Sequence, residues 1–261
     1  MLSKIYNTFS VFFTQKIPVS IKYLRINILA MLRSNDLTKL AGIYGTDKTG
    51  SHWYTDHYMT HFKKYRFKKI KLLEIGVGGY EDLKSGGESL RMWKRYFPFA
   101  DIISFDIHDK RALQENRIKI FQGSQVDKDF INELCQNEGP FDIIIDDGSH
   151  INEHIIETFK LLFPHLKNGG IYAIEDLQTS YWESYGGDSK NLNNPVTAMN
   201  YIKNLSDCLN YQEIPDENYE DTYYDKNIVA LHFYHNLVFI HKNDNNEGSN
   251  TVNNHRYIRK P

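Results

Sequence analysis

The chain has 261 residues, of which 41% are hydrophobic and 25% are charged, and its formal net charge at pH 7 is −2. This length and composition suit a globular protein with one large α/β domain or two small ones, and the lack of a basic excess argues against a nucleic-acid-binding protein. The two cysteines, Cys135 and Cys208, lie far apart, which predicts free thiols in a reducing, cytoplasmic environment and not a disulfide framework.

The first 36 residues are predicted to form a helical extension. Residues 9–13 include an apolar patch that is too short for a membrane span, and no small-residue cleavage site follows it. Residues 21–34 then place apolar side chains at helical spacing, with Lys22, Arg25 and Arg33 between them. This pattern predicts a helix that packs within the protein or forms a homo-oligomer, or else one that makes a peripheral contact with a membrane.

Five β-type segments follow, and polar or acidic residues end them. They are residues 68–79, 100–107, 117–127, 141–150 and 169–176. Helical patterns lie between them at 88–97, 127–137 and 152–166, and this alternation indicates a parallel sheet wound on both sides. The last two apolar segments, 227–233 and 237–242, predict an antiparallel hairpin. The expected fold is therefore α/β, with a doubly wound, mostly parallel, seven-stranded sheet and an antiparallel C-terminal hairpin.

This sheet is expected to form one domain over residues 37–242, between the extension at 1–36 and a tail at 243–261. The tail begins with NDNNEGSNTVNN, which is polar and of low complexity, so we expect it to be flexible. Ligands of doubly wound sheets bind at the carboxyl ends of the strands. The acidic residues of the β-type segments are predicted to lie at these ends.

The first three strand ends predict a nucleoside site. Glu74 precedes a glycine-rich loop that would let the backbone approach a ligand, although a plain tight turn would use the same glycines. Asp106 ends the second segment, where it could accept ribose hydroxyls or lie on the surface. Ser124 and Gln125 lie at the end of the third segment and could face an adenine edge or form a simple turn.

The fourth and fifth strand ends predict a metal site and a base. Asp147, Glu175 and Asp176 would repel one another unless a cation joined them, and oxygen ligands select Mg²⁺, Ca²⁺ or Mn²⁺. The alternative is that these acids cap a helix or face solvent. His150 lies three residues after Asp147 and could accept a proton from a hydroxyl, whereas His154 is expected to be structural.

Several segments of the chain together resemble one known family. They are YGTDKTGSHWYTDHY, LLEIGVGGY, GGESLRMWKRYFP, GSQVD, FDIIIDDGSH and IEDLQTSYW. In order and spacing, from about residue 44 to residue 187, they resemble the metal-dependent sugar O-methyltransferases that act on the deoxysugars of mycinamicin and other macrolides. The resemblance implies the Rossmann-like fold of class I S-adenosylmethionine-dependent methyltransferases. It does not cover the first 35 residues, where the antibiotic enzymes carry a larger domain, or residues 188–220.

The resemblance implies S-adenosylmethionine as methyl donor and Mg²⁺ or Mn²⁺ as metal. It implies that His150 is the general base, and that Asp147, Glu175 and Asp176 hold the metal. The segment at 46–48 is similar to a lid over the donor. The residues expected to bind the donor are Glu74, Gly76, Gly78, Tyr80, Ser89, Asp106, Ser124, Gln125 and Thr46.

The expected activity is methylation of a sugar hydroxyl, and the expected acceptor is a nucleotide-linked sugar or a surface polysaccharide such as a capsule. Residues 188–226 are rich in Asn, Asp and Tyr, which suits recognition of hydroxyl groups. The alternatives are a metal-dependent O-methyltransferase of a catechol or another non-sugar vicinal diol, and a non-catalytic nucleotide-binding module. A nicotinamide-dependent oxidoreductase is disfavoured, because a dinucleotide-binding loop would need glycine where the chain has Glu81. No transmembrane segment is predicted.

Overall fold

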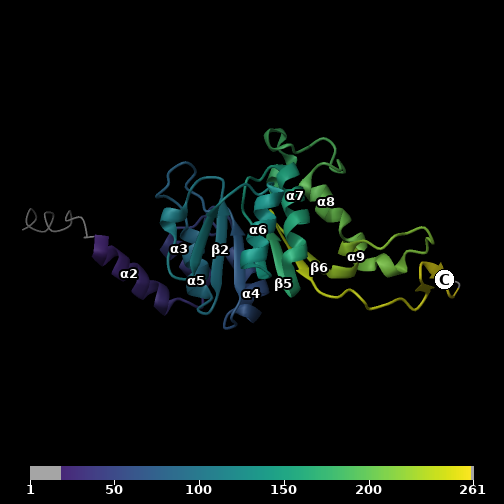
Figure 1. Cartoon of the computed structure of the whole chain (residues 1–261), viewed down its shortest axis with the longest axis horizontal. Helices are drawn as coiled ribbons and strands as arrows, with labels where there is room; N and C mark the ends of the chain where they lie inside the picture. Colours follow the sequence, from purple (N-terminus) through teal and green to yellow (C-terminus); the bar gives the residue numbers. More distant parts are fainter. Residues whose placement is uncertain (1–18, 260–261) are drawn as a thin grey trace, which may run out of the picture.

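The computed structural model describes residues 19–259, and its centre is a seven-stranded sheet (Figure 1). The strands are β1 (Lys71–Ile75), β2 (Asp101–Asp106), β3 (Ile118–Gln122), β4 (Phe141–Asp146), β5 (Leu166–Ile174), β6 (Ile228–Tyr234) and β7 (Leu237–Lys242). Their order in the sheet is β3-β2-β1-β4-β5-β7-β6. The first five strands pair in parallel, and β7 pairs antiparallel with β5 and β6. The predicted doubly wound sheet with a C-terminal hairpin is confirmed.

Helices cover both faces of this sheet. The α-helices are α2 (Val19–Leu32), α3 (Leu37–Tyr44), α4 (Thr55–Phe62), α5 (Glu88–Tyr96), α6 (Lys128–Glu138), α7 (Asn152–Leu162), α8 (Ala198–Asn204) and α9 (Tyr223–Asn227). The 3₁₀ helices are η2 (Lys63–Tyr65), η3 (Arg111–Leu113), η4 (Phe163–His165), η5 (Leu177–Tyr181), η6 (Glu183–Tyr185) and η7 (Asp207–Glu213). Buried hydrophobic residues form a core on each face of the sheet. The core on one face includes side chains of α3, α4 and α5, and the core on the opposite face includes side chains of α6, α7 and α8.

The apolar runs of the central strands follow from burial on both faces. In β4, Ile143 and Ile145 contribute to the core under α3, α4 and α5, whereas Ile144 contributes to the core under α6 and α7. Successive side chains of a strand point to opposite faces, so a strand covered on both sides is apolar without alternation. This is why the sequence showed continuous β-type segments there.

The register aligns the carboxyl ends of the central strands. Ile75 of β1 lies opposite Asp146 of β4, and Asp146 lies opposite Ile174 of β5. The residues that follow these positions therefore meet at one edge of the sheet. We refer to it as the carboxyl edge.

The two ends of the described chain lie at opposite ends of the molecule (Figure 1). Residues 19–32 form α2, while residues 1–18 of the predicted extension lie outside the described residues. In the predicted tail, β8 (Val252–Asn253) pairs with β9 (Arg256–Tyr257), and His255 contacts the carbonyl of Ile214 at 2.8 Å. Most of the tail is therefore placed against the segment before β6, although its boundary and flexibility stay predictions. Among residues 19–259, helices are too short or too polar to cross a membrane.

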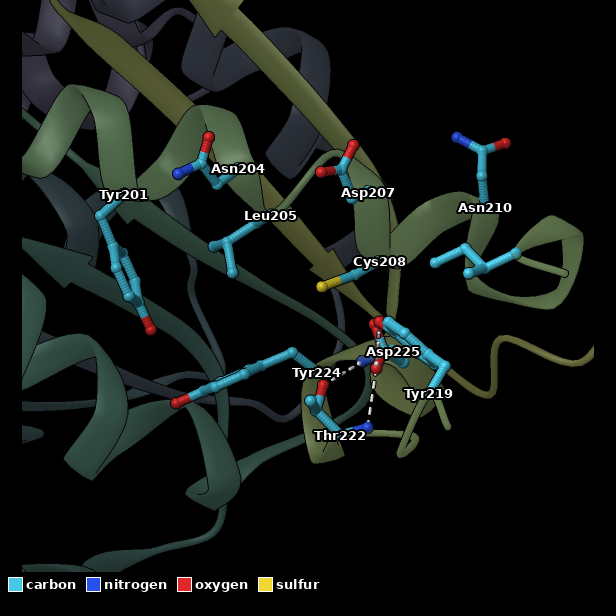
Figure 2. Close-up of a pocket in the computed structure, with 11 residues that line it drawn as sticks. Tyr201, Asn204, Leu205, Asp207, Cys208, Asn210, Tyr219, Thr222, Tyr224 and Asp225 are labelled. Atoms are coloured by element: carbon cyan, nitrogen blue, oxygen red, sulfur yellow. Dashed lines mark hydrogen bonds between the residues drawn. The ribbon is translucent and has the colours of Figure 1, made fainter. Parts of the chain in front are cut away.

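A cavity of about 760 Å³ lies among α8, η7 and α9 (Figure 2). Tyr201, Cys208 and Asp225 are among the residues that line it. Since α9 leads into the amino end of β6, and β6 runs in the same direction as β5, this cavity lies away from the carboxyl edge.

Candidate active site

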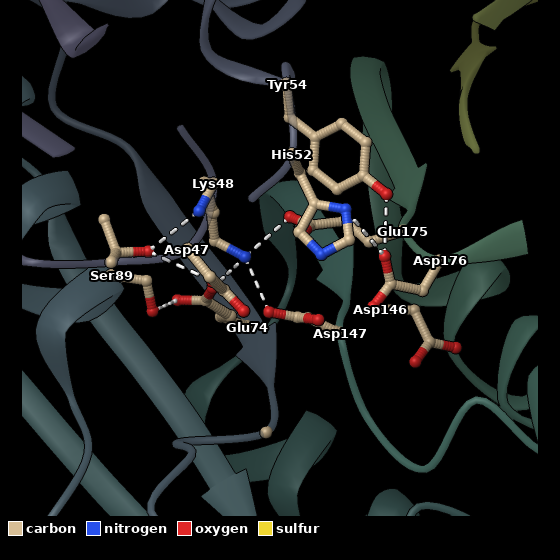
Figure 3. A network of polar contacts seen from close by, with 12 residues as sticks. Asp47, Lys48, His52, Tyr54, Glu74, Ser89, Asp146, Asp147, Glu175 and Asp176 are labelled. Carbon is tan, nitrogen blue, oxygen red and sulfur yellow. Dashed lines mark hydrogen bonds and ion pairs between the residues drawn. The ribbon is translucent and has the colours of Figure 1, made fainter. Parts of the chain in front are cut away.

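A fully buried lysine lies at the carboxyl edge, surrounded by acids from three strand ends. Lys48 comes from the loop between α3 and α4. Its Nζ lies 2.6 Å from Oδ2 of Asp147, 2.7 Å from Oε1 of Glu175 and 3.2 Å from Oε1 of Glu74 (Figure 3). The sequence predicted that residues 46–48 cover the donor, but it did not predict that Lys48 pairs with these acids. We call these four residues the lysine–acid cluster.

Three acids share one ammonium in the lysine–acid cluster. Burial alone would lower the pKa of Lys48, but Asp147, Glu175 and Glu74 raise it well above its ordinary value, so the ammonium stays charged. Burial, aided by the charge of Asp147, raises the pKa of Glu74 to about 7 and raises the pKa of Glu175 well above its ordinary value. A single ammonium faces three carboxyl groups, and the raised pKa values of Glu74 and Glu175 mean that the folded protein resists ionising both of them. A cationic ligand beside these acids would favour their ionised forms.

A second, partly exposed group adjoins this cluster. Asp147, His150 and Asp176 each offer one potential ligand atom, and these atoms lie within 4.8 Å of one another. Nε2 of His150 is 3.6 Å from Oδ2 of Asp176 and 3.9 Å from Oδ1 of Asp147. Asp147 belongs to both groups, because its Oδ2 faces Lys48 and its Oδ1 faces His150. The side chains of the second group are therefore partly exposed to solvent, while Asp147 is also paired with the buried Lys48.

Hydrogen bonds from residues 44–58 orient two of the acids. Tyr54 donates to Oδ1 of Asp176 at 2.7 Å, and Tyr58 donates to Oε1 of Glu175. Burial would raise the pKa of Asp176, but the hydrogen bond from Tyr54 and the nearby His150 and His52 lower it below its ordinary value. Asp176 is therefore an ionised carboxylate that can bind a cation. Neither tyrosine nor His52 was among the predicted site residues, although the segment SHWYTDHY is dense in hydroxyl and imidazole groups.

His150 and Asp176 share an uncommon backbone conformation. Their φ angles are 57° and 54°, in the left-handed region that few residues other than glycine adopt. Such residues cost about 1–3 kcal/mol each and cluster at functional sites, where the surrounding structure imposes them. Here the conformation directs an imidazole and a carboxylate toward each other from two different strand ends.

Gly76 allows the loops after β1 and β4 to touch. Its φ is 91°, and a Cβ at this position would lie 2.2 Å from the carbonyl oxygen of Asp147. The amide of Asp147 donates to the carbonyl of Ile75 at 3.2 Å. A larger residue at position 76 would therefore displace the backbone that carries Asp147.

Three residues predicted to bind the donor lie around the first two strand ends. Ser89 donates to Oε2 of Glu74 at 3.0 Å. Asp106 accepts the amides of Val77 and His108, each at 2.9 Å, so it links the glycine loop to the end of β2. These contacts hold Glu74, Ser89 and Asp106 at one edge and fix the path of the loop between them.

Gln125 is buried and holds the loop that carries His150. Its Oε1 accepts the amide of Ser149 at 2.8 Å, and its Nε2 donates to Oγ1 of Thr158 at 2.9 Å. Nδ1 of His154 lies 2.9 Å from Oγ of Ser149 in the same loop. In this structure Gln125 thus positions the loop of the expected base.

The remaining predicted donor residues differ in their surroundings. The Ser124 hydroxyl accepts the amide of Val126 at 3.4 Å, and Thr46 is buried beside Lys48. Gly78 has a φ of 79° and continues the loop. Tyr80 is 88% exposed, so its side chain is largely in solvent and does not share the buried surroundings of the others.

The sequence resembles several curated proteins, although no family model matches it. Mycinamicin VI 2''-O-methyltransferase from Micromonospora griseorubida is 47% identical over 83% of this chain and 55% of its own length. Demethylmacrocin O-methyltransferase from Streptomyces fradiae is 48% identical over 82% of this chain and 54% of its own length. The chain thus spans about half the length of the curated relatives it matches.

A solved structure is also similar to this chain. It is the MycE methyltransferase of the mycinamycin biosynthetic pathway in complex with Mg and SAH. The TM-score is 0.80 at 47% sequence identity, over 82% of this chain and 56% of that chain. Sequence and fold therefore point to the same group of proteins.

Proposed function

Since this chain is a homologue of the macrolide deoxysugar O-methyltransferases and shares their class I methyltransferase fold, we propose that it is an S-adenosylmethionine-dependent, Mg²⁺-dependent sugar O-methyltransferase. The observation that carries this proposal is the joined pair of groups at the carboxyl edge. Asp147 connects a buried surplus of carboxylates to a partly exposed group that contains His150 and Asp176.

The partly exposed group fits a hard divalent cation. Asp147 and Asp176 offer carboxylate oxygens, and Mg²⁺ typically binds one or two carboxylates together with water and substrate oxygens. We also assign Glu175 to the metal. The hydrogen bonds from Lys48 and Tyr58 both go to its Oε1, so this assignment uses its other oxygen.

The lysine–acid cluster and the neighbouring loop fit the methyl donor. S-adenosylmethionine supplies the methyl group from a cationic sulfur, which suits the surplus of buried carboxylates. We assign the donor to Glu74, Ser89 and Asp106, with the glycine loop beneath it. The edge of the donor site would be lined by Thr46, Ser124 and Gln125. Tyr80 would contact the donor only if its exposed side chain turned inward.

In the proposed reaction His150 acts as general base. Its Nε2 would accept the proton of the acceptor hydroxyl, and Asp176 and Asp147 would stabilise the resulting imidazolium. A divalent metal, when bound, would lower the pKa of the acceptor hydroxyl. Gln125 and the left-handed backbone at His150 hold the base in place, which suits a transfer that depends on positioning.

Exposed aromatic side chains beside the site support a sugar acceptor. Tyr181 and Trp182 lie five and six residues after Asp176 in the chain and are both exposed. Asn152 at the start of α7 donates to the carbonyls of Thr179 and Tyr185, so this aromatic segment is tied to the helix that follows His150. We propose that the segment stacks on a sugar that is nucleotide-linked or part of a surface polysaccharide such as a capsule.

The acceptor proposal has a direct test. Candidate acceptors, including nucleotide sugars, surface oligosaccharides, glycosylated macrolides and catechols, are incubated with S-adenosylmethionine and Mg²⁺ and examined by mass spectrometry. We expect methylated sugars. Products from catechols alone would favour the non-sugar diol enzyme, and donor binding without any product would favour a non-catalytic module.

Two further features support the proposals that the protein is cytoplasmic and that it forms a homo-oligomer. Both cysteines are free thiols, as a reducing cytoplasm would allow. Exposed apolar side chains on α2, including Leu24, Met31 and Leu32, support a homo-oligomer.

Donor binding is expected to depend on Asp106. Asp106→Ala should weaken S-adenosylmethionine binding by about 10–100-fold, since it removes hydrogen bonds to a charged acceptor, and calorimetry measures the change. Asp109→Ala is the matched control, because Asp109 is a partly exposed acid near the end of the same strand and pairs with Arg111. Equal donor affinity in the Asp106→Ala variant and the parent protein would contradict the assignment.

Turnover is expected to need a divalent cation. Treatment with EDTA should abolish methyl transfer, and Mg²⁺ or Mn²⁺ should restore it. Asp176→Asn keeps the size of the side chain but removes its charge, so it should raise the Mg²⁺ concentration needed for half-maximal rate. Methyl transfer that is indifferent to EDTA would show that these acids do not hold a catalytic metal.

A further inference from the structure

A cluster of histidines lies where α4 crosses the β6–β7 hairpin, outside the candidate active site. Its members are His61 of α4, His232 of β6 and His241 of β7. Their ring centroids are 4.8 Å (His61–His232), 5.0 Å (His232–His241) and 5.2 Å (His61–His241) apart. One nitrogen of each ring lies within 4.8 Å of the corresponding nitrogens of the other two. Three imidazoles from three separate elements therefore converge.

The fold sets the position of each ring. His232 lies opposite Phe239 in the hairpin, and His241 lies two residues after Phe239, so both histidines are on the same face of the sheet. His61 stacks on Phe239 with a centroid distance of 4.1 Å. All three rings are thus carried by regular elements, which position ligands more accurately than loops do.

The two inner rings are neutral near neutral pH. Burial, with the neighbouring imidazoles, lowers the pKa of His61 to about 4 and the pKa of His241 to about 3, and nearby Lys64 acts in the same direction. A neutral imidazole offers a lone pair without first losing a proton. The cluster is therefore ready to bind a metal at physiological pH.

The hydrogen bonds favour a defined arrangement of these lone pairs. Nε2 of His61 lies 3.0 Å from the hydroxyl of Tyr234, and Nδ1 of His61 lies 3.1 Å from Nε2 of His241. If Nε2 of His61 donates to Tyr234, Nδ1 carries the lone pair that faces the cluster, and such an outer hydrogen bond commonly orients histidine ligands. Two nitrogens bound tetrahedrally to zinc at about 2.0–2.1 Å are roughly 3.3 Å apart, close to the separation found here.

We propose that His61, His232 and His241 form a binding site for Zn²⁺, separate from the site proposed for Mg²⁺. Imidazole nitrogens suit zinc, whereas Mg²⁺ and Ca²⁺ prefer oxygen ligands, and the cluster contributes no carboxylate. His232 is exposed at the edge strand, so water can complete the coordination. The bound ion would join α4 to the edge hairpin.

The test is a calorimetric titration of the full chain with Zn²⁺ in excess Mg²⁺, which occupies the carboxylate site. We expect one strong Zn²⁺ site per chain, and His232→Ala should weaken it at least about tenfold. His232 is chosen because its exposure lets the variant fold. His235→Ala is the matched control, since His235 is an exposed histidine of the same hairpin outside the cluster. Equal Zn²⁺ affinity in the His232→Ala variant and the parent protein would overturn the proposal, as would the lack of a strong Zn²⁺ site.

Two further measurements identify where the ion binds. Zn²⁺ should raise the melting temperature of the parent protein and of Asp176→Asn, but not that of His232→Ala, because only the last variant lacks a cluster ligand. Co²⁺ in place of Zn²⁺ should give the visible absorption of a four-coordinate ion in the same two proteins. If Asp176→Asn loses the Zn²⁺ effect and His232→Ala keeps it, the ion binds at the candidate active site and the cluster is only a hydrogen-bonded packing contact. None of these measurements depends on methyl transfer.

Discussion

Replacing His150 with alanine is expected to lower kcat by about 10²–10⁴, the usual range for the loss of a positioned base. Nε2 of His150 faces both Asp147 and Asp176, so the imidazole is the group placed to receive a proton beside the proposed metal ligands. Donor affinity should change little, because the donor is assigned to Glu74, Ser89 and Asp106. Steady-state kinetics gives kcat, and calorimetry gives the donor Kd.

His154→Ala is the matched control for this variant. His154 lies four residues further along the chain and contacts Ser149, so its loss should affect stability more than catalysis. A near-normal kcat in His150→Ala, with a reduced kcat in His154→Ala, would reverse the two roles. Near-normal kcat in both variants would mean that neither histidine is the base.

Replacing Lys48 with methionine is expected to lower the free energy of unfolding by about 3–5 kcal/mol, the range for removing one partner of a buried ion pair. The substitution keeps an apolar stem of similar length but leaves the carboxylates of Glu74, Asp147 and Glu175 without their ammonium. Glu74 and Glu175 are buried, so without the ammonium they must either stay charged with little solvation or take up protons, and both cost free energy. Denaturant unfolding followed by circular dichroism measures the change.

The cause of this loss can be separated from a general effect of losing a lysine. Lys39→Met removes an exposed lysine that pairs with Asp36 near the surface, and it should cost less than about 1 kcal/mol. Adding Glu175→Gln to Lys48→Met should recover part of the stability, because it removes one of the buried carboxyl groups that have lost their ammonium. A Lys48→Met protein as stable as its parent would mean that the acids are not charged in the folded state.

The strands of the sheet could be predicted from the sequence because strands that are buried on both faces appear as continuous apolar segments. The segment from Phe141 to Asp146 is an apolar run covered on both faces, and its abrupt acidic end marks the carboxyl edge. Parallel pairing in register then brings such ends together, so the convergence of Asp147 with Asp176 could be expected before the structure. Similarly, residues 227–242 predicted the hairpin from two apolar segments and a short turn.

The contacts of the segment before β1 could not be predicted in the same way. Lys48 stands in a polar stretch, where a lysine is normally exposed, and only the packing of α4 on the sheet brings Lys48, Tyr54 and Tyr58 to the carboxyl edge. Tyr80 follows the glycine loop in sequence, and its side chain is exposed, so its predicted role at the donor stays a prediction. Periodicity reports which face of an element is buried, and it does not report which distant loop covers a strand end.

The contact between Gly76 and the backbone of Asp147 has a consequence for how the protein folds. These two loops, about 70 residues apart in the chain, fit together only when β1 and β4 are paired in register. The site therefore cannot form from either loop alone in a partly folded chain. Contacts between such distant residues form late and slowly. A ligand held between these loops recognises the native state alone, and at 100 times its Kd it would raise the free energy of global unfolding by about 2.7 kcal/mol. Donor binding would therefore protect amides throughout the sheet from hydrogen exchange, including those far from the ligand.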